Sequence, residues 1–455
     1  MTSSERLVVI GGDASGMTAA SLAKKMRPDL DVVALEKGPW TSYSACGIPY
    51  VIGGDVGSIE ELVVRTPEQH RANGIDARTM HEATGIDLDA REVEVRDIDA
   101  ARTYRLGFDQ LVIATGAVPR RPPLPGFLDE KVRGVQTLDD GAQLLAHAKK
   151  VGADKVVVVG AGYIGLEIAE AFVKRGASVT VVEREPEVLA ATMDPEMGAR
   201  VRQAMERHGI DVRTGDSVDG FDGTAVHTAA GPIEADLVVL GLGVAPNSAL
   251  ASEAGIRLGA HDAIGVDVRQ RTSAEGVWAA GDCCESFHLV SHRKVHVALG
   301  TVANKQGRVV GINVGGGYAT FPGVVGTAVT KLCSTEVART GLSEREATEV
   351  GFGYVVGRIE STTRAGYFPG AKPITVKVLA ERGGGELLGA QIVGEEGAAK
   401  RIDVLATALT ARFTVEDFLH LDLSYAPPFA PVWDPVLMAA RKAWDAVQQE
   451  HTSRH

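Results

Sequence analysis

Cys46 is the residue with the clearest chemical potential, and it lies between small side chains in the stretch SYSACGIPYVIGG. The four cysteines form neither a CxxC pair nor a cluster with metal-ligand spacing: Cys46, Cys283, Cys284 and Cys333. We therefore expect neither a zinc site nor a disulfide framework. In a reducing compartment a lone cysteine is either a packing residue or a nucleophile, and the thiolate is the reactive form. Packing is the expectation for Cys283, Cys284 and Cys333, the last of them on a strand.

A glycine-rich loop near the start of the chain gives this cysteine a chemical context. The loop lies between the predicted strand RLVVIGG and the predicted helix SGMTAASLAKKM, and its candidate cofactor contacts are Gly11, Gly12, Ala14, Ser15 and Gly16. Glycines let a pyrophosphate approach the backbone at a helix N-terminus, and Glu36, about 20 residues on, would bind ribose hydroxyls. Asp13 stands where the dinucleotide pattern has its second glycine, so an ordinary strand-to-helix turn is the alternative.

A second loop carries a complete dinucleotide fingerprint after a strand of four valines. Its candidate cofactor contacts are Gly160, Gly162, Tyr163, Ile164 and Gly165. Glu183 ends the following predicted strand, and its carboxylate disfavours a 2′-phosphate, which favours NADH over NADPH. The neighbouring Arg184 keeps NADPH open as an alternative.

Two such sites in one chain suit one flavin and one nicotinamide. Thr115 and Gly116 follow a predicted strand in LVIATGA. Gly281 and Asp282 follow another in GVWAAGDCCE, where the aspartate could bond a ribityl hydroxyl or order a water at the flavin phosphate. The segment HVALGTVANKQGRVVG predicts a helix whose N-terminus would offer partial positive charge to the reduced flavin ring.

The repeated strand–loop–helix–strand order sets the domain organisation. A chain of 455 residues is too long for one core, and the segments ATGAVPRRPPLPG and LGLGVAPN, rich in proline and glycine, mark crossings between domains. We predict an α/β fold with two Rossmann-like domains and a C-terminal α+β domain. The expected boundaries are 1–115 with 245–320 for FAD, 116–244 for NAD(P)H, and 321–455 for the C-terminal domain.

Charge and hydropathy limit the partners. The formal net charge of −12 disfavours nucleic acid or an anionic membrane as the main partner. No apolar run reaches membrane-spanning length, and the first residues lack the apolar stretch of a signal peptide. We expect a cytoplasmic protein that acts on a small molecule.

Together, the motifs resemble those of the FAD- and NAD(P)-dependent pyridine nucleotide-disulfide oxidoreductases over nearly the whole chain. The matching segments are SYSACGIPYVIGG, RTPEQ, ATGAVPR, GAGYIGLE, AAGDCCE and YAPPF. The chain looks most like the single-cysteine branch, which includes coenzyme A disulfide reductases, NADH oxidases and peroxidases, and persulfide reductases. The resemblance implies Cys46 at the flavin ring, Lys37 and Ala83 as further cofactor contacts, and a homodimer formed by the C-terminal domain.

Two tyrosines match positions of this branch. Tyr425, in YAPPF, matches its C-terminal catalytic tyrosine, and Tyr367, in RAGYFPG, matches a second tyrosine of coenzyme A disulfide reductases. A phenol can donate a proton to a leaving thiolate or stabilise an oxyanion. Interface packing is the alternative for both.

The substrate pattern agrees only in part with coenzyme A. A histidine that supports a cysteine sulfenate in NADH peroxidases is Ala14 here, which favours a disulfide over peroxide or oxygen. Thr18 and Ser42 match the coenzyme A contacts, and Lys25 and Arg71 could meet phosphates or remain solvated surface charges. Positions that depart from the coenzyme A pattern are Leu22, Lys25, Ala45 and Trp433. A smaller or less charged thiol partner fits these departures better.

The leading hypothesis is an FAD-dependent NAD(P)H oxidoreductase that reduces a low-molecular-weight disulfide or persulfide. NADH would reduce FAD, with Tyr163 covering the flavin until the nicotinamide displaces it, and FAD would reduce an oxidised Cys46. One alternative is an NADH oxidase that reduces dioxygen. Another is an electron-transfer flavoprotein reductase for a protein partner, which needs no cysteine at the flavin.

Overall fold

Strand β1 (Arg6–Ile10) is the centre of the first parallel sheet in the computed structural model, which describes residues 5–452. The sheet has the order β18-β7-β1-β2-β3, and its other strands are β2 (Asp31–Leu35), β3 (Ile75–Arg78), β7 (Gln110–Ile113) and β18 (Val277–Ala279). Because β1 is covered on both faces, it is a continuous aliphatic run. Val8 and Ile10 pack with Val93 in one core, and Leu7 and Val9 lie in another.

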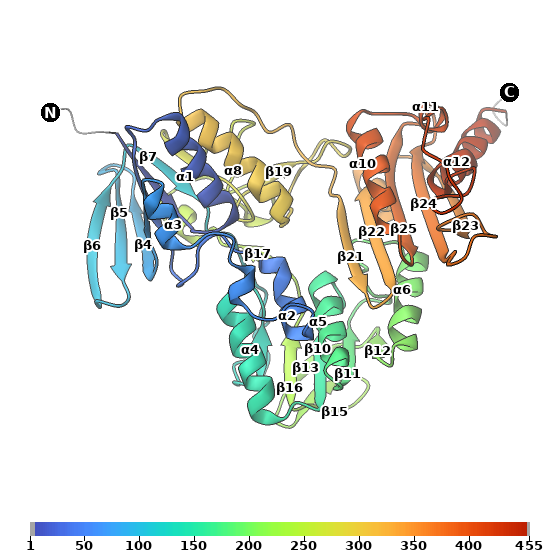
Figure 1. Cartoon of the computed structure of the whole chain (residues 1–455), viewed down its shortest axis with the longest axis horizontal. Helices are drawn as coiled ribbons and strands as arrows, with labels where there is room; N and C mark the ends of the chain where they lie inside the picture. The colour runs from blue at the N-terminus through green and yellow to red at the C-terminus, as the bar shows by residue number, and fades with distance from the viewer. Residues whose placement is uncertain (1–4, 453–455) are drawn as a thin grey trace.

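Helices cover one face of this sheet and a small antiparallel sheet covers the other. The helices are α1 (Ala14–Met26) and α8 (Gly300–Val314), and the antiparallel strands are β4 (His81–Asp87), β5 (Glu92–Asp97) and β6 (Arg102–Gly107) (Figure 1). Helices α1 and α8 cross closely at Gly307, which has no side chain; a Cβ there would overlap the backbone of Ser15. The first glycine loop is thereby supported by two helices. Short α3 (Pro67–Ala72) leads into β3.

The second parallel sheet repeats this plan with the order β12-β11-β10-β16-β9. Its strands are β9 (Val132–Gly134), β10 (Lys155–Val159), β11 (Ser178–Glu183), β12 (Asp211–Thr214) and β16 (Leu237–Leu240). Helices α4 (Leu138–Val151), α5 (Tyr163–Lys174) and α6 (Pro195–Arg207) belong to this unit, as do strands β13 (Val218–Phe221), β14 (Ala225–Thr228) and β15 (Ile233–Glu234). We call this second sheet with its helices the second unit, and the β1-centred sheet with its helices the first unit.

The two predicted crossings lie side by side. Strand β8 (Ala117–Pro119) pairs antiparallel with β17 (Val244–Pro246), so the chain leaves and re-enters the first unit at one place. Asn247 fastens this point, because its carbonyl accepts the Thr115 hydroxyl at 2.5 Å and its amide hydrogen is donated to Gly116. Thr115 and Gly116 are therefore held at the junction of the two units.

The C-terminal part is an antiparallel sheet with the order β21-β22-β25-β24-β23, next to the second unit in Figure 1. Its strands are β21 (Ala328–Leu332), β22 (Thr335–Gly341), β23 (Tyr354–Thr362), β24 (Pro373–Glu381) and β25 (Leu387–Gly394). Its helices are α9 (Glu344–Val350), α10 (Ile402–Thr410), α11 (Val415–Leu419) and α12 (Pro435–Thr452). The predicted fold class, α/β with two βαβ units and an α+β C-terminal domain, is confirmed.

Local predictions need two corrections. Cys333 is not on a strand: it occupies the tight turn between β21 and β22 with φ +52°, because the hairpin needs a left-handed residue there. Helix α8 begins at Gly300, so the residues from His296 to Leu299 precede it in extended or irregular backbone. Strands β24 and β25 form an antiparallel hairpin.

A buried ion cluster ties the C-terminal sheet to the second unit. Lys377 on β24 is fully buried and pairs with Asp194 at 2.8 Å and with Glu196 and Glu344. Asp194 also accepts a hydrogen bond from Gln391 at 2.7 Å. Three carboxylates and several hydrogen bonds satisfy the buried ammonium, and removing one partner of such a cluster is costly.

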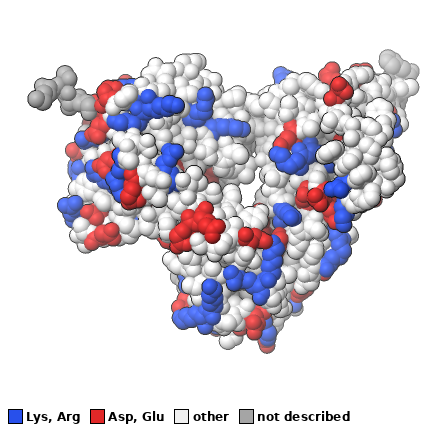
Figure 2. Space-filling view, in the orientation of Figure 1, with Lys and Arg blue, Asp and Glu red and all other residues white. Residues whose placement is uncertain are grey.

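The surface carries both signs of charge. Figure 2 shows Lys and Arg side chains interspersed with Asp and Glu over the three lobes, and the face it presents has no continuous basic stripe. Within residues 5–452, none of the helices has the length and hydropathy that a membrane span requires. The remaining short elements of the first unit are α7 (Ala249–Glu253), β19 (Ser286–Phe287) and β20 (Lys294–Val295).

Candidate active site

The first glycine loop is shaped by close backbone approach. Gly11 has φ +116°, in the region that favours glycine, and a Cβ there would overlap the carbonyl of Ala114. A Cβ on Gly16 would overlap the carbonyl of Gly11. The first hydrogen bond of helix α1 runs from the Met17 amide to Asp13, so the amides before Met17 lie at the open helix end, where they can bind an anion.

Glu36 anchors this loop from the end of β2. Its carboxylate accepts the Gly12 amide and the Gly38 amide, both at 2.7 Å. Burial raises the pKa of this carboxyl. The side chain thus fixes the loop in addition to its predicted contact with ribose. Lys37 is exposed and pairs with Glu82 at 2.9 Å.

The other predicted contacts of the first site surround the same loop. The Ser15 hydroxyl donates to the carbonyl of Ala280 at 2.9 Å, and the Gly281 amide donates to Gln306 at 2.8 Å. Burial raises the pKa of Asp282 to about 6. A glycine cradle, an open helix end and a partly buried carboxyl fit the pyrophosphate and ribityl groups of FAD. Ala83 lies on β4, where it packs against the core of the first unit.

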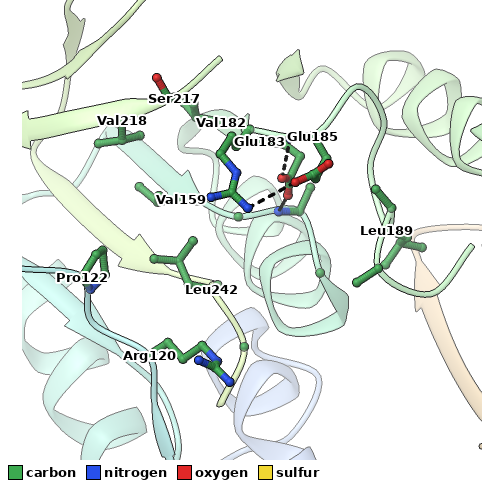
Figure 3. Close-up of a pocket in the computed structure, with 18 of the residues that line it drawn as sticks. Arg120, Pro122, Val159, Val182, Glu183, Glu185, Leu189, Ser217, Val218 and Leu242 are labelled. Atoms are coloured by element: carbon green, nitrogen blue, oxygen red, sulfur yellow. Dashed lines mark hydrogen bonds and ion pairs between the residues drawn. The ribbon is translucent and has the colours of Figure 1, made fainter. Parts of the chain in front are cut away.

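The second glycine loop opens onto a cavity of about 980 Å³. Gly160 has φ +99°, and a Cβ on Gly165 would overlap its carbonyl. Glu183 anchors this loop as Glu36 anchors the first: it accepts the Ala161 amide at 2.7 Å and the Glu185 amide at 2.9 Å. Figure 3 shows this cavity between the glycine loop, the end of β11 and the segments that carry Leu189, Ser217 and Leu242.

Tyr163 and the arginines complete this cavity. Gly162 and Tyr163 line its wall at the start of α5, and burial raises the pKa of the Tyr163 phenol. Ile164 is partly buried against the core of the second unit. Arg184 is paired with Glu185 at 3.2 Å, and its side chain is 80% exposed. Size, glycine turn and acidic anchor together fit a dinucleotide.

Cys46 lies between the two units. It is exposed on a 3₁₀ turn (Ala45–Gly47) that runs into α2 (Ile48–Gly53). Upstream, the Ser42 amide donates to the Gly12 carbonyl at 2.9 Å, which attaches the segment to the first glycine loop. Downstream, Ile48 and Ile52 are buried in the core of the second unit with α5. The thiol is therefore supported from both nucleotide sites.

The electrostatic surroundings of Cys46 oppose thiolate formation in the protein without bound cofactors. Neighbouring protein atoms desolvate the sulfur and raise the pKa of the Cys46 thiol, and the charges of Glu167 and Asp282 raise it further. Cys283 and Cys284 are buried, and their thiols face backbone carbonyls and glutamine side chains. Cys46 is the cysteine that solvent reaches most freely within the described residues.

The four predicted substrate residues are not equivalent. Ser42 lies next to the cysteine segment with φ +47°, and the Thr18 hydroxyl donates to Asn304 at 2.9 Å. Lys25 is exposed on α1. Arg71 is committed elsewhere, because it donates to the Ala77 carbonyl at 2.7 Å and pairs with Glu68 at 2.5 Å. Of the four residues, Ser42 is the closest to Cys46 in the sequence.

Tyr367 and Tyr425 lie together on the C-terminal part. A hydrogen bond with Tyr367 raises the pKa of the Tyr425 phenol, and the two residues are 78% and 47% exposed. The neighbouring Phe429 and Trp433 are also exposed. Such a cluster of exposed aromatic side chains is typical of an interaction surface.

Three residues, two near Cys46 and one at the dinucleotide cavity, escaped the sequence analysis. His70, 1% exposed, bonds the Ser42 hydroxyl through Nε2 at 3.0 Å, and burial lowers its pKa to about 4. Glu167 on α5 accepts the Thr330 hydroxyl at 2.8 Å, and burial raises the pKa of Glu167. Arg345 of α9 lines the dinucleotide cavity from the C-terminal part. Only Glu167, which follows the second fingerprint in GAGYIGLE, stood inside a motif.

Comparison with known proteins agrees with this geometry. The profile of the pyridine nucleotide-disulphide oxidoreductases matches residues 5–307, and the profile of that family's dimerisation domain matches residues 327–435. The chain belongs to this family. The enzyme is accordingly an oxidoreductase that uses FAD and a pyridine nucleotide.

Three relatives span nearly the whole chain. An NAD(P)H sulfur oxidoreductase (CoA-dependent) of Pyrococcus abyssi is 40% identical over 443 residues, which are 96% of this chain and 97% of that protein. An NADH oxidase of Methanocaldococcus jannaschii is 36% identical over 96% of this chain and 98% of that protein. The solved structure of an NAD-dependent persulfide reductase from A. fulgidus superposes with a TM-score of 0.94 and 38% identity, covering 98% of this chain and 84% of that one.

Proposed function

We propose that this enzyme uses NADH to reduce a low-molecular-weight disulfide or persulfide through Cys46. The observation that carries the proposal is the place of Cys46: an exposed thiol, fastened to the first glycine loop at Gly12 and packed through α2 onto the second unit. The relatives named as a sulfur oxidoreductase and a persulfide reductase support the same substrate class.

Reduction of the disulfide proceeds in two steps at Cys46. The Cys46 thiolate attacks one sulfur of RSSR, which forms a mixed disulfide and releases RS⁻. When bound, FAD supplies the relay that passes an electron pair from nicotinamide to sulfur. Two electrons cleave the mixed disulfide and regenerate the Cys46 thiolate with a second RS⁻. One NADH and one proton thus convert RSSR into two RSH and NAD⁺.

The protein's own residues hold the two nucleotides and manage the proton. Glu36 and Glu183 fix the glycine loops, and the Asp282 carboxylate would accept a hydrogen bond from a ribityl hydroxyl of FAD. Tyr163 separates the dinucleotide cavity from the first site until nicotinamide enters. Tyr425 and Tyr367 donate protons to the leaving thiolate across a homodimer that the dimerisation domain forms. The partner thiol in this proposal is smaller or less charged than coenzyme A, because Leu22 and Trp433 depart from the coenzyme A pattern.

NADH is the preferred donor in this proposal. Glu183 places a carboxylate at the ribose end of the cavity, where it repels a 2′-phosphate. Arg184, adjacent and exposed, retains some use of NADPH. The relative from Pyrococcus abyssi carries a name that includes both donors.

The test is NADH oxidation under argon with the wild-type enzyme and Cys46→Ser. We expect turnover that requires an added acceptor, with CoA disulfide, inorganic polysulfide and a small dithiol's disulfide assayed in parallel. Cys46→Ser should retain reduction of the flavin by NADH, seen as bleaching of the flavin absorbance, and lose acceptor turnover by at least about 1,000-fold, since serine is a far weaker nucleophile. Equal acceptor turnover in both proteins would refute the proposal.

An NADH oxidase is the second candidate, favoured by the name of the Methanocaldococcus jannaschii relative. It predicts rapid NADH oxidation in air without any added acceptor, at a rate that exceeds the disulfide-dependent rate. Assaying both conditions on one preparation separates the two functions.

A further inference from the structure

Asp13 departs from the dinucleotide pattern, and the structure shows where its side chain goes. Aspartate at a helix N-cap usually accepts hydrogen bonds from the first turn of its own helix. Asp13 is the N-cap of α1, yet its side chain does not cap that helix. Its Oδ1 instead accepts the backbone amide of Tyr43 at 2.9 Å.

This bond joins the first glycine loop to the cysteine segment. The adjacent Ser42 amide donates to the Gly12 carbonyl at 2.9 Å, so two successive residues of each segment are connected. From Tyr43 the chain is continuously fastened: the Ser44 amide donates to Leu62 and the Gly47 amide to Ser44, both at 2.9 Å. Cys46 lies inside that last turn.

The backbone at position 13 does not explain the aspartate. Asp13 has φ −111° and ψ −153°, and its counterpart Gly162 has φ −78° and ψ −176°, so both are extended and neither needs glycine. A Cβ on Gly162 would meet only the Gly241 carbonyl, at 3.7 Å. A side chain is thus tolerated at this place, and in the first loop it is used for a contact to Tyr43.

We infer that Asp13 is a positioning residue for Cys46: its carboxylate holds the Tyr43 amide and thereby fixes the segment that carries the thiol. The role of Cys46 in this inference is the one proposed above. The hydrogen bond needs only an acceptor oxygen at position 13. The negative charge of Asp13 acts separately, on the pKa of the Cys46 thiol. The charged groups that face Cys46 from the packed elements are Glu167, Asp282 and Asp13 itself, and the last of them also raises the pKa of the Cys46 thiol.

The acceptor and the charge can be separated by two substitutions in the FAD-loaded enzyme. Asp13→Asn keeps an acceptor oxygen and removes the charge, and Asp13→Ala removes both. Asp139→Ala is the matched control. Asp139 accepts the indole N–H of Trp40 at 3.0 Å, so this substitution also removes a carboxylate acceptor, but the lost bond is to a side chain and not to a backbone amide.

Hydrogen exchange of the peptide that covers residues 41–47 is the first readout, and it needs no turnover. We expect at least about tenfold faster exchange at this peptide in Asp13→Ala, the effect of losing a charge-assisted hydrogen bond. Exchange in Asp13→Asn and in Asp139→Ala should stay within about threefold of wild type. FAD content, read from absorbance, is measured on each variant, and exchange is compared at saturating FAD.

Alkylation of Cys46 against pH is the second readout, followed on its own peptide so that Cys333 does not interfere. Asp13→Asn should shift the alkylation profile to lower pH, because a negative charge near the thiolate is removed.

In steady-state assays Asp13→Ala should lower kcat with KM for NADH within about twofold, and Asp13→Asn should restore most of kcat. Wild-type exchange in Asp13→Ala, or equal failure of the asparagine and alanine variants, would overturn the inference. Loss of disulfide turnover in the wild type would instead count against the proposed function alone.

Discussion

The two glycine loops are built alike but are enclosed differently. Each is anchored by a glutamate that accepts an amide of its loop at 2.7 Å, Glu36 for Gly12 and Glu183 for Ala161. The second loop opens onto a cavity of about 980 Å³, while the first is hydrogen-bonded to the cysteine segment through Asp13 and Gly12. We therefore propose that the second loop binds an exchanging dinucleotide and the first a retained one.

Substitutions at the close glycine contacts should have the largest effects on cofactor binding. A Cβ on Gly16 or on Gly165 would overlap the carbonyl oxygen of Gly11 or Gly160, a backbone atom that cannot rotate away. We expect Gly165→Ala to raise KM for NADH about 10- to 100-fold with normal FAD content, and Gly16→Ala to lose FAD on gel filtration. Gly107→Ala serves as the control, because a Cβ there would meet only the Arg91 carbonyl, at 3.9 Å. Retained FAD in Gly16→Ala would show that the first loop does not hold FAD in this way.

Buried carboxyls distinguish the first site in the enzyme stripped of FAD. Burial raises the pKa of Asp282 from 3.8 to about 6, so the folded chain binds a proton that the unfolded chain releases between these values. Stability therefore falls as pH rises from about 4 to 6, and stays lower above. Asp282→Asn should gain about 1–2 kcal/mol at pH 8, after allowance for its partial exposure, and close to nothing at pH 4. Urea unfolding at both pH values measures this, and an equal gain at both would contradict it.

The anchoring glutamates should respond in parallel but report on different cofactors. Glu183→Gln keeps one acceptor oxygen and loses the charge, so we expect KM for NADH to rise about fivefold, the effect of about 1 kcal/mol. Glu36→Gln should speed FAD dissociation by a similar factor and leave KM for NADH unchanged. Crossed effects, with Glu36→Gln acting on NADH, would show that the two sites are not independent.

The smallest difference concerns the basic residue after each glutamate. Arg184→Gln should raise KM for NADPH about three- to tenfold and change KM for NADH by less than twofold, because only NADPH carries a 2′-phosphate. Lys37→Gln should change neither KM value, since an exposed pair with Glu82 contributes little. An equal effect of Arg184→Gln on both donors would place the arginine away from the 2′-phosphate.

The sequence predicted what depends on local pattern. The glycine fingerprints, the valine-rich strand β10 and the crossing segments identified the two βαβ units, because close backbone approach requires glycine and a covered strand requires aliphatic residues. Cys46 was identified because it lies between small residues, with the two glycine fingerprints on either side of it in the sequence. The pattern also gave Glu36 and Glu183, though not their bonds to Gly12 and Ala161.

What escaped prediction depends on contacts between distant segments. His70 meets Ser42 only because α3 folds back under the cysteine segment, and Arg345 reaches the cavity only because the C-terminal sheet packs on the second unit. Asp13 looked like a flaw in the motif, since its partner, Tyr43, lies 30 residues away. Cys333 was placed on a strand because no glycine or asparagine marked the two-residue turn.

The packing of α2 against α5 bears on how such enzymes can be recombined. The cysteine segment is encoded before the second unit, yet Ile48 and Ile52 complete the second unit's core, and Arg175 donates to the Ile52 carbonyl. A chimera that exchanges the second unit between two relatives at the crossings would therefore bring a foreign surface under the native cysteine. Transplanting residues 48–56 together with the second unit should preserve the packing of α2 on α5. The segment to exchange in such a chimera is therefore larger than the second unit itself.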